Sequence, residues 1–379
     1  MQFSLIIIFK TLFFKSPIVS MNSLQENLNS LKFVIVVWRH GDRTSTSLFP
    51  SDKENSLGKI EKKFGGLGQL TELGALQQFK LGQFLKERYG DFLSEEYSHE
   101  EFAYRSSDYN RTKMSILANA QGMFSSFGQN VPNFPLTKNV PKNGITIKYL
   151  PKGKDPIVFD EVDCPAAKNE DNKVFESEAF IEKEKANNHL LQFIAKNTDL
   201  ILSLRNISKV HDPLTFIDAH QLDGFKLPEW ANDTVRKEIF RLYNLKQKRL
   251  LSGPLFTEIL KRMENIALKT DTKLKFQVYS GHDGTVAGLL AIFGIDLEVY
   301  PTFSTAVLIE LHKQPNNIEE GTDYFIRIFH KNETGGNYLK EIEIPECGLN
   351  CNLKQLREIR REFIIGVKEW KTECKNNNN

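Results

Sequence analysis

The sequence predicts an α/β fold: a mainly parallel central sheet flanked by helices, with an inserted, mainly helical segment. Three stretches predict the sheet, because each is an apolar run that ends in a polar, glycine-containing or serine-rich turn and continues as a helical pattern: residues 31–44, 102–114 and 274–293. Strand patterns nearly vanish from residue 155 to residue 251, where charged residues recur at helical spacing. We therefore expect an α/β core from residues 31–154 and 252–374, with residues 155–251 forming a helical cap domain over its site.

The first stretch runs from Leu31 to Thr44, LKFVIVVWRHGDRT. Its apolar residues 33–38 are mostly β-branched, which predicts a strand buried on both faces. In open α/β sheets, ligands bind just past the carboxyl ends of such strands. Here that position holds Arg39, His40 and Arg43, two guanidinium groups and an imidazole that could receive a dianion and attack it. Taken alone, an Arg-His pair at a strand end is more often an exposed loop. Gly41 is expected to let the backbone turn sharply and approach a ligand.

A helix should follow from Thr71, as its N-cap, to about Tyr89, where Gly90 ends it. The second stretch then begins with a short strand, residues 102–104, and we expect Arg105 and Ser106 to leave that strand. Ser107 or Asp108 is predicted to cap a helix that continues to about residue 127. Alone, an arginine in this position is more often part of a surface ion pair.

The third stretch predicts a strand over residues 274–279, a polar turn with His282 and Asp283, and a helix over residues 286–293. A buried histidine beside an Asp that caps the helix is the competing interpretation. Before this strand, Ser252-Gly-Pro254 is expected to start a helix over residues 255–268.

Other patterns complete the predicted fold. Residues 144–150 alternate as a strand should, and residues 305–312 and 324–330 predict an antiparallel pair joined by the polar segment 314–322. Helical patterns cover residues 176–207, 233–251 and 353–365.

The charge balance of the chain excludes some classes of partner. Fifty basic and 48 acidic side chains leave a net charge of +2, so a general electrostatic footprint for nucleic acid or an anionic membrane is absent. Apolar content of 40% is that of a globular protein. The sequence has no uninterrupted apolar run of about 18 residues, the length that a membrane span requires.

The N-terminus predicts a secretory signal peptide over residues 1–20, an apolar segment that ends in Ile18-Val19-Ser20. It lacks a basic start, and Lys10 and Lys15 interrupt it, so a misassigned start with Met21 as the first residue is the alternative.

The cysteines and sequons are compatible with a secretory route. Four cysteines suit two disulfides, and Cys347 and Cys351 could close a small loop; a zinc site is the competing interpretation, although Cys164 and Cys374 supply neither a close pair nor a His pair. Glycosylation is expected at the sequons of Asn206, Asn232 and Asn332, rather than at Asn110 inside the second stretch.

The motifs of all three stretches resemble those of the histidine acid phosphatases, of the prostatic and lysosomal type, in the phosphoglycerate-mutase-like superfamily. Arg39-His40-Gly41-x-Arg43 resembles the first family motif, and Arg105-Ser-Ser-Asp108 resembles the second, with Ser107 in place of a threonine. His282-Asp283 resembles the third. The resemblance spans residues 31–374. It implies the phosphoglycerate-mutase-like fold, disulfides Cys164–Cys374 and Cys347–Cys351, and a secreted or lysosomal location, and it allows a homodimer.

The resemblance also implies an acid phosphatase that hydrolyses small phosphate monoesters through a phosphohistidine intermediate. His40 would be the nucleophile and Asp283 the general acid. The phosphate would be held by four side chains: Arg39, Arg43, Arg105 and His282. No metal or other cofactor is expected, since three arginines supply the positive charge. Arg111, on the predicted helix, is expected to be structural.

Three other functions compete with this one. The mutase branch of the superfamily uses a different acid and lacks the arginine that stands here as Arg43, and a catalytically idle binding protein should have lost the nucleophile or the acid. Phytase activity would be a substrate variant, although some phytases carry His-Ala-Glu where this chain has His282-Asp283. Structural roles are expected for three further candidates in the cap: His211, His220 and Trp230.

Overall fold

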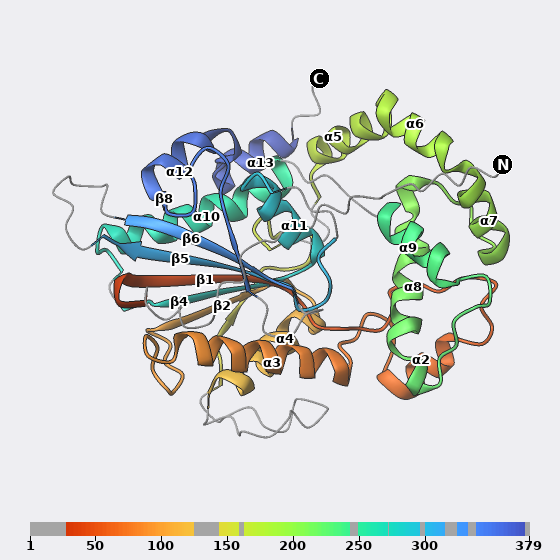
Figure 1. Ribbon diagram of the computed structural model, residues 1–379, viewed down its shortest axis with the longest axis horizontal. Helices are drawn as coiled ribbons and strands as arrows, with labels where there is room; N and C mark the ends of the chain where they lie inside the picture. The colour runs from red at the N-terminus through yellow and green to blue at the C-terminus, as the bar shows by residue number, and fades with distance from the viewer. Residues whose placement is uncertain are drawn as a thin grey trace, which may run out of the picture.

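The computed structural model describes residues 28–124, 144–158, 163–242, 249–271, 273–295, 300–314, 324–332 and 339–375. The predicted signal peptide, residues 1–20, lies outside the described residues, as does most of the expected turn at 314–322. The predicted α/β class is confirmed: a central sheet lies between two layers of helices (Figure 1).

Within the described residues the sheet has eight strands in the order β3-β2-β4-β1-β5-β6-β7, with β8 paired to β6. The four strands from β3 to β1 are parallel, and the pairings from β1 to β7 are antiparallel, which confirms the predicted closing pair β5–β6. The strands are β1 (Leu31–Arg39), β2 (Phe102–Ser106), β3 (Ile147–Lys148), β4 (Phe276–Gly281), β5 (Ala306–Lys313), β6 (Tyr324–Lys331), β7 (Leu339–Ile342) and β8 (Cys351–Asn352).

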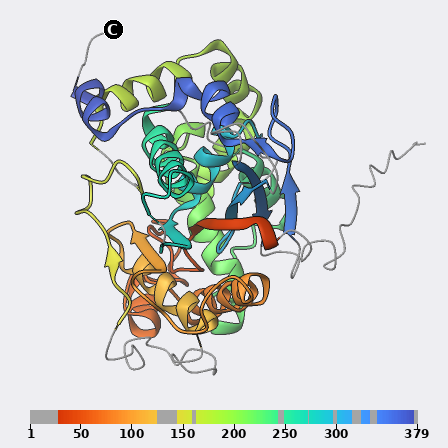
Figure 2. The same ribbon diagram turned by 90° about the vertical axis from the view of Figure 1, so that its left-hand side faces the viewer.

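One face of the sheet packs against α3 (Glu72–Tyr89) and α4 (Asn110–Met123), and the other against α10 (Arg249–Ala267), α11 (Asp283–Ile292) and α12 (Leu353–Ile359). Figures 1 and 2 show the two helix layers on opposite sides of the strands. The residues of β1 from Phe33 to Trp38 are buried on both faces, as their unbroken apolar pattern predicts.

The remaining helices form a lobe beside the sheet, on the right in Figure 1. They are α2 (Leu57–Phe64), α6 (Glu178–Ala186), α7 (Asn188–Thr198), α8 (Ser208–Ala219) and α9 (Asp233–Leu242), while α5 (Pro165–Phe175) packs against α13 (Val367–Lys375). Short 3-10 helices occur at Leu28–Ser30, Leu204–Asn206, Gln221–Asp223 and Arg361–Phe363.

The lobe has its own apolar core, and that core is not made from residues 155–251 alone. Phe49 and Ile60, from the segment between β1 and α3, are buried in it beside Phe216 and Phe225. Near the start of the predicted insertion, Cys164 and Ala167 do not join this core; they are buried against Trp370 and Cys374 near the C-terminus. The start of the predicted insertion is therefore packed against the C-terminal helix of the chain, while the segment between β1 and α3 completes the apolar core of the lobe.

Among the predicted element boundaries that were wrong, two helix starts have local reasons. Helix α4 begins at Asn110 and has no side-chain cap, because Asp108 pairs instead with Lys113 (Oδ1–Nζ, 2.6 Å). Helix α10 begins at Arg249, so Pro254 lies inside it rather than at its start. Pro254 has no backbone N–H with which to bond the carbonyl of Leu250. That carbonyl accepts a hydrogen bond from the Trp370 indole instead (2.9 Å).

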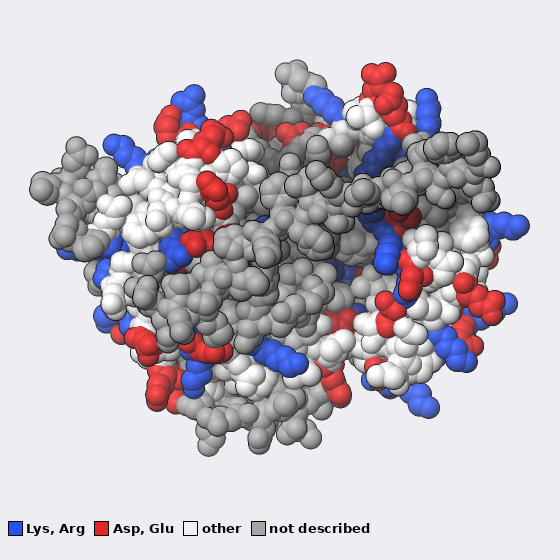
Figure 3. All heavy atoms as spheres, in the orientation of Figure 1, with Lys and Arg blue, Asp and Glu red and all other residues white. Residues whose placement is uncertain are grey.

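Both disulfides implied by the resemblance are present. Cys164–Cys374 ties the start of α5 to the C-terminal helix, and Cys347–Cys351 closes a four-residue separation before α12. Searched over the part of the chain that the structure describes, the helices include none that is long and apolar enough to cross a bilayer. On the face shown in Figure 3, acidic and basic side chains are interspersed.

Candidate functional site

The three polar segments meet at one rim of the sheet. Because β1, β4 and β2 are parallel neighbours, their carboxyl ends lie together, with Arg39 opposite Gly281 and Ser106 opposite Ser280. The backbone N–H of His40 donates to the carbonyl of Gly281 at 3.0 Å. The first and third motifs are therefore side by side, and the second motif leaves its strand at the same rim.

His40 lies at the centre of this rim and is 2% exposed. Its Nδ1 is 2.7 Å from the carbonyl oxygen of Gly41, which can only accept, so Nδ1 carries the proton. Nε2 then carries the lone pair, and it accepts a hydrogen bond from Nε of Arg111 at 3.1 Å. The geometry thus fixes one tautomer and presents Nε2 as the nucleophilic atom.

The surroundings keep His40 uncharged. Burial lowers the pKa of His40 well below its ordinary value of 6.5, and the positive charge of Arg111, the neighbouring His282, and the charges of Arg43 and Arg39 lower it further. The pKa of His282 is lowered in the same way, by burial first and then by Arg111. The two rings lie edge to face, with centroids 5.4 Å apart. Both imidazoles are therefore neutral in mildly acidic solution.

Gly41 is required by close packing rather than by a turn. A Cβ placed on Gly41 would lie 2.1 Å from the carbonyl oxygen of Gly74, in the first turn of α3, and a Cβ on Gly74 would lie 2.1 Å from the carbonyl oxygen of Asp42. Thr71 caps α3 as predicted, since its side chain accepts a hydrogen bond from the backbone N–H of Gly74. The loop that carries His40 is therefore seated directly on the start of α3.

Arg39 connects the first motif to the third. Its guanidinium lies 3.2 Å from the carboxylate of Asp283 and donates to the carbonyl of Pro301 at 2.7 Å. The same guanidinium lies over the ring of Phe303, 4.1 Å from its centroid. Phe303 also lies 5.8 Å from the His40 ring, centroid to centroid, and the sequence analysis missed it. Nothing in the local sequence around Phe303 marks it as a site residue.

Arg43 connects the site to the helical lobe. It forms an ion pair with Asp212 of α8 (2.8 Å), whose other carboxylate oxygen accepts hydrogen bonds from the backbone and hydroxyl of Thr46. Burial alone would raise the pKa of Asp212, but the charge of Arg43 and these hydrogen bonds hold it below its ordinary value. Asp212 therefore positions Arg43 from the lobe, as an anion.

Arg105 does not lie where the sequence interpretation placed it. Strand β2 continues through Ser106, so Arg105 lies within the strand, opposite Tyr279 on the face covered by α10 and α11. Its guanidinium forms an ion pair with Asp155 at 2.7 Å. The period-2 alternation of a strand thus directs this side chain away from the α4 face of the sheet.

Arg111 occupies the place expected for Arg105. It is the second residue of α4, is 6% exposed, and contacts His40 directly through its Nε. The expectation that Arg111 is structural is therefore corrected by its position. A signal for it existed: a residue in the first turn of the helix that follows β2 points back to the rim at which β2 ends.

Two neighbours of Arg111 also belong to the site. The ring of Tyr109 lies 4.1 Å from the Arg111 guanidinium and 5.3 Å from the His282 ring, centroid to centroid. The hydroxyl of Ser107 lies 2.8 Å from Nε2 of His282. Ser107 is thus the residue of the second motif that orients the histidine of the third.

His220 of the lobe is buried between two carboxylates. Its Nε2 lies 2.7 Å from Asp42 and its Nδ1 lies 2.6 Å from Asp223, which is itself paired with Lys63. Burial disfavours the protonated ring, but the hydrogen bonds and charges of Asp42 and Asp223 outweigh this effect and raise the pKa of His220 above its ordinary value of 6.5. The protonated ring therefore ties the lobe to Asp42, in the loop that carries His40.

We expect replacement of His220 with Gln to destabilise the fold by about 1–3 kcal/mol at pH near 5, and by less at pH near 8. Because the pKa of His220 is raised in the folded state, its protonation stabilises the fold fully below the ordinary pKa of 6.5. That contribution is lost as the pH rises through the pKa of the folded state. Denaturant titrations at the two pH values measure the difference. His189, exposed on α7, is the matched control, and an equal loss at both pH values would contradict this role.

A cavity of about 260 Å³ lies between the rim of the sheet and α8. Residues of both the rim and the lobe line it, among them Arg39, Arg43, Asp283 and Phe303 from the core, and Asp212 and His211 from α8. Taken together, the geometry defines a site with three guanidinium groups and a carboxylate around a neutral, oriented imidazole. Such groups are typical of a site that binds a phosphoryl group, because guanidinium groups bind its oxygens and a neutral imidazole can act as a nucleophile.

Comparisons with known proteins agree with that class. A family model described as "Histidine phosphatase superfamily (branch 2)" matches residues 30–331. A Caenorhabditis elegans protein named as an acid phosphatase is 35% identical over 93% of this chain and 81% of its own. Human prostatic acid phosphatase is 32% identical over 92% of this chain and 89% of its own. The chain belongs to branch 2 of the histidine phosphatase superfamily, and it is a phosphatase.

A comparison with solved structures supports the fold. The phytase of Citrobacter braakii superposes with a TM-score of 0.61, covering 91% of this chain and 99% of the phytase. Its sequence identity is 13%, so this likeness concerns the architecture alone.

Proposed function

We propose that this protein is an acid phosphatase that hydrolyses phosphate monoesters through a phosphohistidine at Nε2 of His40. The observation that carries the proposal is the state of that ring: buried, neutral, and held by Gly41 so that Nε2 faces Arg111. A neutral imidazole can attack phosphorus directly, whereas a protonated one cannot. A lowered pKa keeps His40 reactive in acid, where exposed histidines are charged.

Three arginines would bind the equatorial oxygens of the phosphoryl group: Arg39, Arg43 and Arg111, with Arg111 replacing Arg105 in this role. Arg39 and Arg111 now contact acceptors that a phosphate oxygen can replace, namely Asp283 and Nε2 of His40, while Arg43 is positioned by Asp212. Their fixed charge stabilises the transition state as a metal ion does in other phosphoryl transfers, so the proposed reaction uses no cofactor. His282, oriented by Ser107, would contribute a further hydrogen bond.

Asp283 is the group placed to protonate the leaving oxygen. It is the first residue of α11, its side chain is 22% exposed, and it lines the cavity. In the first step it would give its proton to the alcohol while the P–O bond breaks and the P–Nε2 bond forms. In the second step the carboxylate would take a proton from the water that attacks the phosphohistidine.

The family and the disulfides support a secretory destination, outside the cell or in lysosomes. We extend the proposal to glycans at Asn206, Asn232 and Asn332, of which Asn232 is exposed at the start of α9.

Replacing Asp283 with Asn should separate the two kinds of leaving group. We expect hydrolysis of β-glycerophosphate, a poor leaving group, to fall by about 10²-fold or more, because its alkoxide must be protonated. Hydrolysis of p-nitrophenyl phosphate, whose phenolate leaves without a proton, should fall much less in the first step. Single-turnover phosphorylation rates with both substrates measure this contrast.

The second substrate supplies the control, because its leaving group needs no proton. An equal loss on both substrates in the Asp283→Asn protein would contradict the proposed acid.

A further inference from the structure

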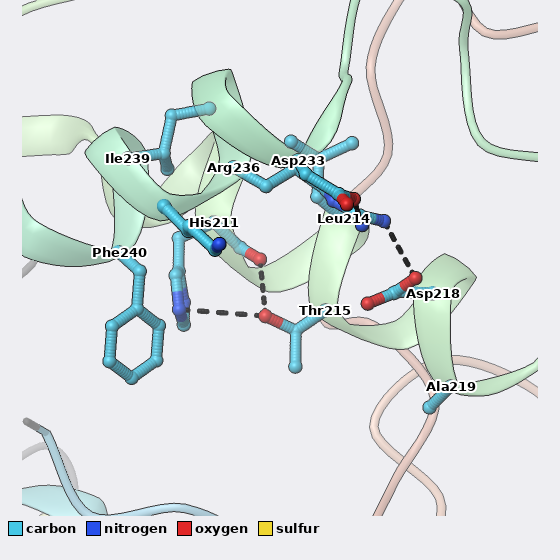
Figure 4. Close-up of a pocket in the computed structure, with 10 residues that line it drawn as sticks. His211, Leu214, Thr215, Asp218, Ala219, Asp233, Arg236, Ile239 and Phe240 are labelled. Atoms are coloured by element: carbon cyan, nitrogen blue, oxygen red, sulfur yellow. Dashed lines mark hydrogen bonds and ion pairs between the residues drawn. The ribbon is translucent and has the colours of Figure 1, made fainter.

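A second cavity, a groove of about 520 Å³ between α8 and α9, adjoins the cavity of about 260 Å³ at the rim, which we call the phosphate cavity. His211 and Thr215, which Figure 4 shows in this groove, also line the phosphate cavity, so the two cavities share a wall. We propose that this groove is the subsite for the leaving group, and that it selects phosphate monoesters of aromatic alcohols. The proposal rests on the phosphatase function and adds the class of substrate to it.

The position of the groove follows from the two helices. Its α8 side is a single stripe at helical spacing, His211, Leu214, Thr215 and Asp218, and its α9 side is contributed mainly by residues 233–240. The stripe begins at the residue that precedes Asp212, the partner of Arg43. A substrate whose phosphate lies between Arg39 and Arg43 can therefore extend its alcohol part along α8.

Two rings lie side by side in the groove, and one of them, His211, also lines the phosphate cavity. The centroids of His211 and Phe240 are 5.3 Å apart, and Figure 4 shows the two side chains next to each other. Burial lowers the pKa of His211 to about 4, and the charge of Arg39 contributes to this shift. In mildly acidic solution His211 is therefore neutral, and with Phe240 it presents flat, uncharged faces on which an aromatic ring can pack.

The deeper wall is apolar, and of the two cations that line the groove, Arg236 and Lys237, the first is paired with two carboxylates. Leu214 and Ile239 are buried beneath the groove, at 3% and 1% exposure. Arg236 is paired with both Asp218 (2.6 Å) and Asp233 (2.5 Å). A further phosphate on the leaving group could pair with Arg236 only by displacing Asp218 or Asp233, whereas an apolar ring would be removed from water against Leu214 and Ile239.

Kinetics with two substrates test the proposal. The wild type should have a lower KM for naphthyl phosphate than for β-glycerophosphate, which is too small to fill the groove. Replacing Phe240 with Ala should raise the KM for naphthyl phosphate about tenfold and leave the KM for β-glycerophosphate within about twofold, because only the ring contact is lost. The Phe240→Tyr protein should restore the wild-type preference.

The matched control is Phe193→Ala, which removes a 40% exposed phenylalanine of the same lobe outside the groove. That variant should change neither KM. Equal changes for both substrates in Phe240→Ala, no change for either, or a stronger wild-type preference for dodecyl phosphate than for naphthyl phosphate would overturn the aromatic subsite while leaving the phosphatase intact. If the wild type hydrolyses neither ester, the proposed function fails and the subsite falls with it.

Discussion

Replacement of His40 with Ala should lower kcat/KM for p-nitrophenyl phosphate by about 10⁴-fold or more. The proposed reaction forms a covalent bond to Nε2 of this ring, and the neighbouring arginines offer no nucleophile in its place. His40 is buried at the rim beside Gly281 and Arg111, so its truncation also removes packing and hydrogen bonds, and a second variant is needed to separate lost chemistry from a change of fold. Steady-state kinetics across acid pH measure the loss.

A second variant shows whether the remaining site is intact. His40→Asn keeps a side-chain amide able to donate to the carbonyl of Gly41, as Nδ1 does now. We expect it to be inactive and still to bind inorganic phosphate by calorimetry, because Arg39, Arg43 and Arg111 remain. Activity of His40→Asn above a thousandth of the wild type would contradict nucleophilic catalysis by His40.

The second large effect is expected at Arg111. The Arg111→Gln protein should lose about 10²- to 10³-fold in kcat/KM, as when a preorganised donor to a transition state is removed. The charge of Arg111 also lowers the pKa of His40, so its removal raises that pKa. The acid limb of the kcat/KM profile, where His40 becomes protonated, should therefore move to higher pH.

The neighbouring motif supplies the control for this prediction. Arg105→Gln, in the same segment, breaks an ion pair with Asp155 on the other face of the sheet. It should lower the melting temperature and leave the pH profile of kcat/KM in place, with at most about a tenfold change in its height. If Arg105→Gln shifts the acid limb and Arg111→Gln does not, the assignment of the two arginines is reversed.

The sheet and the rim could be predicted from the sequence because their signals are local. The apolar run before Arg39 predicts β1, and parallel strands bring their carboxyl ends to one edge, so His40 and His282 had to meet once both strands were recognised. Thr71 as the N-cap of α3 and the antiparallel pair β5–β6 were likewise predicted by short patterns.

The choice between the two arginines depended on a strand boundary that the sequence leaves open. Ending the strand at Tyr104 places Arg105 at the rim; continuing it to Ser106, as observed, places Arg105 within the sheet. A shift of two residues at the strand end therefore changed which guanidinium reaches the phosphate site. Short strands have too few residues for their period to fix such a boundary.

Contacts from the lobe could not be predicted, because they join residues far apart in the chain. Asp212 pairs with Arg43, and His220 pairs with Asp42, across about 170 residues or more of sequence. His211 and His220 were expected to be structural. The structure places His211 at the wall of the phosphate cavity and His220 against the loop of His40, which only the folded arrangement reveals.

The most direct test of the central claim is to trap the phosphorylated enzyme. Wild-type protein mixed with radiolabelled substrate at acid pH should be quenched within milliseconds into alkali, where phosphohistidine survives, and its peptides mapped by mass spectrometry. We expect one labelled site, His40, phosphorylated at Nε2, because Nδ1 is hydrogen-bonded to the carbonyl oxygen of Gly41. Rapid turnover with no labelled peptide, or label on Nδ1 or on a different residue, would contradict it.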